Sequence, residues 1–276
     1  MPDALYLCIG QSNMIGYNRS PVLDGRQPAS APPAAEKPIR LSKLRLWTGY
    51  GLRALPSPFL LPDEATFGLP NLTPTPGHGP LPSFADQIRR KHRLNPAFLL
   101  CARNGHGFAS WSPGSIFHRK MLRRLMHGMT ELPLAGVLVQ IGETDAATAD
   151  DAEQWQARVR DLLSEVRSTA NRINTALGRA QTHIPVTLAR LGRLSAARVH
   201  SGDFPYWDCV ARQQQESALP GVTIVETSDL PREPDGLHFS ATALDELGRR
   251  FVDATPPPNL LGYPPPEPRR TSPRAL

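Results

Sequence analysis

Cysteine is scarce in this chain of 276 residues, and no two cysteines form a CxxC pair. The three cysteines are Cys8, Cys101 and Cys209. An odd number of widely spaced cysteines indicates neither a disulfide framework nor a zinc knuckle. The histidines also lack a spaced ligand set such as HExxH. We therefore expect no metal and no cofactor.

Long apolar runs are absent as well. No run approaches the roughly 20 residues that a helix needs to cross a bilayer. The N-terminal stretch MPDALYLC lacks a basic segment followed by a long apolar one, so it does not resemble a secretory signal. We expect a cytoplasmic protein without a membrane partner, and secretion after removal of a leader is the alternative. Nothing in the sequence indicates the oligomeric state.

Charge of one sign is only mildly in excess, with 31 basic against 25 acidic residues. The basic residues gather in runs 88–93 and 118–124 and in the C-terminal tail. Such runs are typical either of binding to nucleic acid or of solvated helix faces. No aromatic interleaving and no nucleic-acid motif accompany them. We favour solvated faces and expect no nucleic-acid partner.

Proline, in contrast, is abundant, and its 30 residues concentrate in three segments. The segments are Pro21–Pro38, Pro56–Pro82 and Pro256–Pro273. Proline disrupts helices and central strands, so we interpret the first two segments as loop insertions, roughly residues 19–43 and 55–82. We interpret residues 255–276 as a disordered tail. One folded domain over residues 1–254 remains.

Five short apolar runs predict buried strands, at residues 4–9, 97–102, 136–141, 185–191 and 222–226. Each run is continuous rather than alternating, which is typical of a parallel sheet covered on both faces. Helical patterns separate the runs, at residues 83–91, 116–129, 151–177, 206–217 and 241–252. Thr148 and Asp151 resemble a capping arrangement for the third helix. The alternation predicts an α/β fold, a three-layer α/β/α sandwich around a five-stranded parallel sheet.

Ligands of such sheets bind at the carboxyl ends of the strands, so we expect chemistry in the loops there. Ser12 follows the first strand in the stretch GQSNM. A serine hydroxyl becomes a nucleophile only when a base removes its proton, and this stretch alone favours a turn residue. The second strand leads into RNGHGFASW at 103–111. Gly105 there is either part of a plain turn or a place where the backbone approaches a ligand.

The remaining two loops hold acids and a histidine. The third strand leads into QIGETD at 140–145. This segment either lines the same sheet edge or places acids at a helix start. In DLPREPDGLHFS at 229–240, Asp235 lies three residues before His238. The carboxylate can accept the Nδ1–H of the imidazole and leave the other nitrogen as a base. The alternative is a capping aspartate and a surface histidine, but four such loops at strand ends favour one joint site.

The motifs GQSNM and DGLHFS, with the Gly-rich and QxGE-like segments between them, resemble the SGNH hydrolase superfamily. They are most similar to its branch of carbohydrate acetylesterases, which includes sialate O-acetylesterases and acetylxylan esterases. The segments GPLPSFADQI at 79–88 and WDCVARQQQ at 207–215 add to a resemblance that spans roughly residues 4–253. The resemblance implies a flavodoxin-like SGNH fold and a serine esterase that removes acetyl groups from a carbohydrate.

The resemblance also implies roles for single residues. Ser12 is the expected nucleophile, His238 the general base and Asp235 the residue that orients the imidazolium. The backbone N–H groups of Ser12 and Gly105 are the expected oxyanion donors, with Gln140 as a third. The expected substrate-binding residues are Gln11, Asn104, Trp111 and Glu143.

The chain departs from the family pattern at two positions. Where the family usually reads Gln-Gly-Glu, this chain places Ile141 in the register of the glutamine. Either Gln140 substitutes from the adjacent position or that oxyanion donor is missing, at a cost of roughly 3–4 kcal/mol in catalysis. Asn104 replaces the first glycine of the usual Gly-Gly pair, so we expect substrate placement to differ.

Two other functions share this set of residues. One is a general short-chain esterase or lipase-like SGNH hydrolase. The other is a non-catalytic carbohydrate-binding relative that keeps the fold. The motifs do not identify the sugar. The insertions, Trp47, Trp111 and His118 are expected at the mouth of the pocket, although both tryptophans are also consistent with packing.

Overall fold

The computed structural model describes residues 4–16, 45–47, 52–54, 79–181, 183–216 and 219–257. For 45–47 and 52–54 the description covers the backbone alone. The predicted insertion 19–43, most of the insertion 55–82 and nearly all of the tail 255–276 lie outside these residues. The extent of the domain therefore stays a prediction.

In the described part of the chain, strands form a single sheet in the order β3-β2-β4-β1-β5-β6-β7. They are β1 (Ala4–Gly10), β2 (Arg45–Trp47), β3 (Leu52–Ala54), β4 (Pro96–Ala102), β5 (Leu134–Gln140), β6 (Val186–Ala189) and β7 (Val222–Val225). The five predicted strands are present and parallel, which confirms the predicted sheet. The prediction misses β2 and the antiparallel β3 at one edge, because strands of three residues leave no clear pattern.

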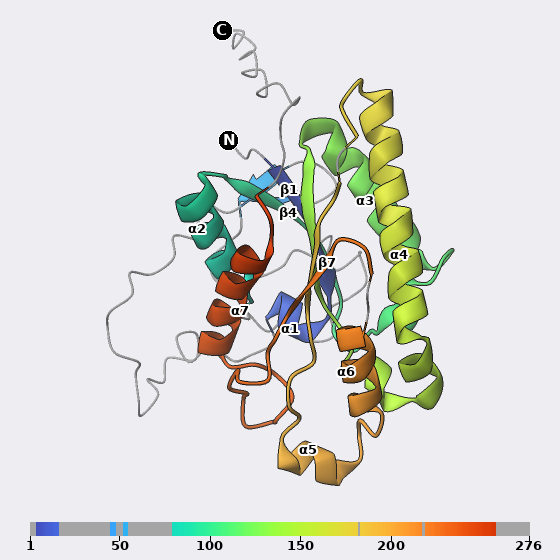
Figure 1. Cartoon of the computed structure of the whole chain (residues 1–276), viewed down its shortest axis with the longest axis vertical. Coiled ribbons are helices and arrows are strands. Elements are labelled where there is room, and N and C mark those ends of the chain that lie inside the picture. The colour runs from blue at the N-terminus through green and yellow to red at the C-terminus, as the bar shows by residue number, and fades with distance from the viewer. Residues whose placement is uncertain are drawn as a thin grey trace, which may run out of the picture.

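Helices cover both faces of the sheet (Figure 1). Helices α2 (Leu81–His92) and α7 (Ala241–Ala254) pack on one face, and α3 (Ile116–Glu131), α4 (Ala149–Ala176) and α6 (Trp207–Glu216) on the other. Successive side chains of a strand point to opposite faces. Those of β1 therefore divide between the two cores, with Leu5, Leu7 and Ile9 on the α3–α4 side and Ala4, Tyr6 and Cys8 on the α2–α7 side. The predicted three-layer sandwich is confirmed.

Side-chain caps fix the starts of α3, α4 and α7. The predicted cap Thr148 accepts a hydrogen bond from the backbone N–H of Asp151 at 3.2 Å, and α4 begins at Ala149, directly after the cap. Ser115 and Ser240 cap α3 and α7 in the same way. Short elements occupy the loops between, namely α1 (Ser12–Ile15), η2 (Phe108–Trp111), η3 (Asp145–Ala147) and α5 (Ala196–Ser201). None of the described helices is long and apolar enough to span a membrane.

The carboxyl ends of the three central strands lie side by side. Gly10 of β1 is in register with Ala102 of β4 and Gln140 of β5. A side chain at Gly10 would lie 2.4 Å from the Cβ atom of Met14 and 2.7 Å from the carbonyl oxygen of Gln140, so only glycine permits the turn from β1 into α1. The loops that follow these strands therefore start at one edge of the sheet.

Candidate active site

Three side chains from the two ends of the chain form a hydrogen-bonded relay. The hydroxyl of Ser12 lies 2.9 Å from Nε2 of His238. Nδ1 of His238 lies 2.6 Å from Oδ2 of Asp235. Because a carboxylate only accepts, Nδ1 carries the proton, and Nε2 is left to accept from the serine hydroxyl. The structure thus brings together the three residues expected to be catalytic, in the arrangement of a nucleophile, a base and an orienting acid.

A tight turn shapes the acid of this relay. Oδ1 of Asp235 accepts hydrogen bonds from the backbone N–H groups of Leu237 at 2.8 Å and His238 at 3.0 Å. Partial burial would raise the pKa of Asp235, but hydrogen bonds from the His238 ring and these two amides outweigh it and hold the pKa below its usual value. Asp235 therefore stays ionised and fixes both the ring position and the tautomer of His238.

The loop after β4 carries Gly105 at the same sheet edge. The backbone N–H of Arg103 donates to the carbonyl of Gly10 at 3.1 Å, which ties the start of this loop to the segment before Ser12. Gly105 is exposed and has a φ of 68°, a conformation that favours glycine. Within the described residues, no acceptor takes the backbone N–H of either Ser12 or Gly105. An oxyanion donor needs an N–H that is not engaged in this way.

Glu143 fixes the Ser12 loop through buried hydrogen bonds. It is 3% exposed and accepts hydrogen bonds from three carboxamide side chains. The donors are Gln11 at 2.7 Å, Asn13 at 2.8 Å and Gln140 at 2.7 Å. Such a fully engaged buried carboxylate stiffens the framework around it. Gln11 and Glu143 are buried in this framework, and their expected contact with substrate stays a prediction.

Trp111 and His118, both expected at the mouth of the pocket, are buried. Trp111 is 1% exposed and packs against Phe117 in the core, a position that fits the packing alternative. His118 is buried on α3, where its Nε2 lies 2.6 Å from Glu165 of α4. Asn104 is half-buried beside Gly105 and stays a predicted substrate contact. The Trp47 side chain lies outside the described part.

Gln140, the expected third oxyanion donor, is the last residue of β5. Its side chain is 2% exposed, and its amide nitrogen donates to Glu143. Ile141, in the register of the family glutamine, is 1% exposed and belongs to the core. The hydrogen bond to Glu143 gives Gln140 a framework role, and its role as a donor to an oxyanion stays a prediction.

Arg232 is a residue of the site that the sequence analysis misses. Its guanidinium lies over the ring of Phe239 at 4.6 Å and donates through Nε to the carbonyl of Arg193 at 2.8 Å. It also donates to the carbonyl of Leu237, next to His238. Burial lowers the pKa of Arg232, against the opposing charges of Glu143 and Asp235. Arg232 braces the His238 loop, and only its position inside DLPREPDGLHFS could have pointed to it.

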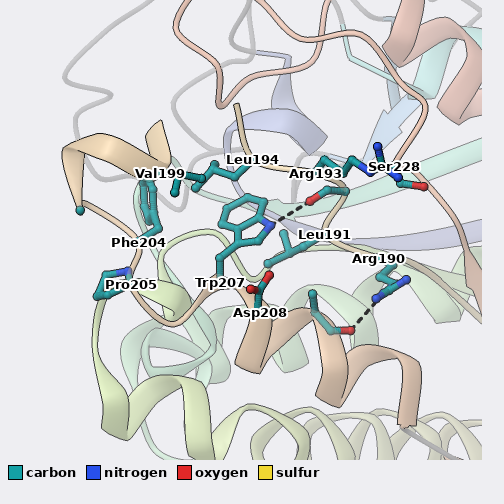
Figure 2. Close-up of a pocket in the computed structure, with 13 residues that line it drawn as sticks. Arg190, Leu191, Arg193, Leu194, Val199, Phe204, Pro205, Trp207, Asp208 and Ser228 are labelled. Carbon is teal, nitrogen blue, oxygen red and sulfur yellow. Dashed lines mark hydrogen bonds between the residues drawn. The ribbon is translucent and has the colours of Figure 1, made fainter. Parts of the chain in front are cut away.

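A cavity of about 720 Å³ lies between the segment after β6 and the start of α6. Figure 2 shows the indole of Trp207 among its lining residues, with Phe204 and Leu194 nearby. None of the three relay residues lines this cavity. Arg198, between the lining residues Leu194 and Val199 in sequence, donates through Nε to the carbonyl of Asp235 at 2.7 Å. Arg198 therefore connects α5, which contributes Val199 to the cavity lining, to the loop that carries Asp235.

No group of three or more metal-binding side chains occurs among the described residues. The arrangement can activate a serine with protein groups alone, through a base and an orienting carboxylate. A parallel α/β/α sandwich with serine, aspartate and histidine in contact at its carboxyl edge is the arrangement that the resemblance to SGNH hydrolases implies. Residues 2–256 match the family described as carbohydrate esterase, sialic acid-specific acetylesterase, and the chain belongs to this family.

Solved structures share the fold at low sequence identity. A crystal structure of a protein from Arabidopsis thaliana is 20% identical with a TM-score of 0.69, over 92% of this chain and 98% of that one. The structure of NanS is 14% identical with a TM-score of 0.60, over 92% and 97% of the two chains. A carbohydrate acetylesterase from Xanthomonas citri is 18% identical with a TM-score of 0.57, over 91% of this chain and 55% of that one. No curated protein sequence matches the chain significantly.

Proposed function

We propose that this protein is a serine esterase that removes acetyl groups from a carbohydrate through an acyl-enzyme on Ser12. The observation that carries the proposal is the relay from Ser12 through His238 to Asp235, with contacts of 2.9 and 2.6 Å. Membership of a carbohydrate esterase family supports the choice of an ester as substrate. The relay weighs against a non-catalytic binding protein, for which a serine aligned with an oriented base has no purpose.

The proposed reaction begins when Oγ of Ser12 attacks the ester carbonyl and its proton passes to Nε2 of His238. The carbonyl oxygen becomes an oxyanion, which the backbone N–H groups of Ser12 and Gly105 receive. The intermediate then collapses, and the bond to the sugar oxygen breaks. His238 returns its proton to that oxygen, so the sugar leaves as an alcohol and the acetyl group stays on Ser12.

Deacylation repeats these steps with water. His238 takes a proton from a water molecule, whose oxygen attacks the acetyl carbonyl of the acyl-enzyme. Collapse of the second intermediate breaks the bond to Oγ, which recovers the proton from His238. Asp235 stabilises the imidazolium that forms in each half of the reaction.

Acetate release from acetylated xylan, acetylated sialic acids and simple acetylated monosaccharides tests the proposal and ranks the sugars. We expect wild type to release acetate from at least one of them, and Ser12→Ala to release none above background. Equal release by the two proteins would contradict the proposal.

The second candidate is a general short-chain or lipase-like esterase, and the shared relay keeps it in view. A series of p-nitrophenyl esters from acetate to octanoate separates the two. A carbohydrate deacetylase should prefer acetate, whereas rising kcat/KM with chain length would support the lipase-like alternative.

A further inference from the structure

Asp145 is a buried carboxyl that the proposed reaction does not use. It follows β5 as the first residue of η3 and is 1% exposed. Its Oδ1 accepts a hydrogen bond from the backbone N–H of Phe108 at 2.8 Å, across 37 residues of sequence. Oδ2 is buried and has no hydrogen-bond partner in the described part of the chain. A buried carboxyl in such surroundings is costly, so its presence needs a reason.

The Phe108 amide ends the loop that presents Gly105. That loop is attached to the rest of the fold at both ends. At its start, Arg103 donates to the carbonyl of Gly10 at 3.1 Å. At its end, Phe108 donates to Asp145. Gly105 lies between them, and a Cβ atom placed there would meet nothing within 4 Å. Its position therefore depends on the attachments of the loop and not on packing.

Close contact with Gly107 makes the second attachment specific. A Cβ atom on Gly107 would lie 2.6 Å from both Cγ and Oδ2 of Asp145. Any side chain at this position would push the carboxyl away from the loop. The Phe108 ring packs edge-on against Trp155 at 5.5 Å, so the loop end cannot simply follow a displaced carboxyl. The glycine is what lets the carboxyl reach the Phe108 amide.

His106 stiffens the middle of the same loop. Its Nε2 accepts from Arg103 at 3.1 Å, which leaves Nδ1 to donate to the hydroxyl of Ser110 at 3.0 Å. Burial, and then the charge of Arg103, lower the pKa of His106, which favours the neutral ring that this pattern requires. These hydrogen bonds make the loop rigid, so a shift at its Phe108 end will also move Gly105.

We propose that Asp145 is a positioning residue for the oxyanion hole, which holds the Gly105 loop so that the backbone N–H of Gly105 meets the developing oxyanion. The inference rests on the esterase function proposed above. Asp145 acts as an acceptor for Phe108, so its charge is not required. Since the Gly105 amide acts mainly in the transition state, its misplacement lowers kcat and leaves KM nearly unchanged.

Three variants test this with p-nitrophenyl acetate. Asp145→Ala removes the acceptor, Gly107→Ala forces the carboxyl off the loop, and Asp145→Asn keeps an acceptor oxygen without the charge. Loss of a whole oxyanion donor costs about 100-fold to 1000-fold in kcat, so we expect a fall of about 10-fold to 100-fold from misplacement. Asp145→Asn should stay within about 3-fold of wild type, and KM should change less than 2-fold throughout.

Two substitutions serve as matched controls. A Cβ atom on Gly136, in β5, makes only ordinary contacts, the nearest at 3.4 Å, so Gly136→Ala controls for the glycine change. Asp161 is exposed on α4, so Asp161→Asn controls for the loss of an acid. Both should keep wild-type kcat. Thermal unfolding and the fraction of Ser12 labelled by a fluorophosphonate normalise each rate to folded, reactive enzyme.

The outcomes separate this inference from the esterase proposal. Wild-type kcat in both Asp145→Ala and Gly107→Ala, in an active enzyme, would overturn the positioning role alone. A fall in Asp145→Asn as deep as in Asp145→Ala would also overturn it, because the acceptor is then not what matters. If Asp145→Ala fails to fold, Gly107→Ala against Asp145→Asn still decides. Inactive wild type would instead contradict the esterase function.

Discussion

Oδ1 of Asn13 accepts a hydrogen bond from the backbone N–H of Phe239 at 2.9 Å. The bond joins the residue after Ser12 to the residue after His238, which are 226 positions apart in the chain. The side-chain amide nitrogen of Asn13 donates to Glu143. Asn13 therefore sets the distance between the expected nucleophile and its base without taking part in proton transfer.

Asn13→Ala should lower kcat for p-nitrophenyl acetate by about 100-fold, since a misplacement of about 1 Å can cost that much in a positioned reaction. Loss of the Asn13 hydrogen bonds to Phe239 and Glu143 should also reduce the free energy of unfolding by about 1–3 kcal/mol. Urea unfolding and initial rates measure the two effects. Asn171→Ala on α4, remote from the relay in sequence, is the control; unchanged kinetics in Asn13→Ala would refute the positioning of Ser12 through Asn13.

Asp235→Asn should reduce kcat by about 10,000-fold, the loss seen when a triad acid becomes neutral and the histidine takes the wrong tautomer. The side chain keeps its size, so the fold should persist. In wild type, the pKa of Asp235 in the folded protein lies below its usual value. The carboxylate therefore stabilises the fold at pH values above the unfolded pKa, and this stabilisation is lost as pH falls through the folded pKa. Wild type should therefore lose more stability on acidification than Asp235→Asn. Equal acid sensitivity would contradict the hydrogen-bonded state of Asp235.

Glu143→Gln should destabilise the protein although the two side chains have the same shape. Three amide nitrogens converge on the Glu143 carboxylate. A glutamine has one acceptor oxygen and points its own N–H₂ at some of these donors, so at least one buried donor loses its partner at about 1–3 kcal/mol. Urea unfolding measures the change, with Glu153→Gln on the exposed face of α4 as the control. Stability equal to that of wild type would contradict the role of the Glu143 carboxylate as the common acceptor of the three amides.

The expected strands and the relay could be predicted because their signals are local. Continuous apolar runs mark buried parallel strands, and GQSNM and DGLHFS each keep a short, specific pattern. Trp111 could not be placed, because an aromatic after a glycine-rich loop reads the same whether it faces a ligand or the core. The roles of Asp145 and Arg232 could not be predicted, for a different reason. Their partners, such as the Phe108 amide 37 residues away, are brought close only by the folded arrangement of the strands.

Asp145 also predicts a pH dependence of stability. Burial raises its pKa to about 7; the Phe108 N–H opposes the shift, and the charges of Asp151 and Glu143 add to it. A carboxyl with a raised folded pKa binds more protons in the folded state, so it lowers stability progressively as pH rises from about 4 to about 7. Asp145→Asn removes this contribution. Thermal unfolding from pH 4 to 8 should show a smaller decline in the variant, and parallel curves would contradict the raised pKa.

The central claim is that Ser12 is a nucleophile activated by His238. Reaction with a fluorophosphonate followed by peptide mass spectrometry tests it most directly, because the adduct marks the attacking atom itself. We expect wild type to carry one adduct on the peptide that contains Ser12, His238→Ala to react at least about 100-fold more slowly, in line with the contribution of a general base, and Ser12→Ala not to react. An adduct on another residue, or equal labelling of wild type and His238→Ala, would contradict the account.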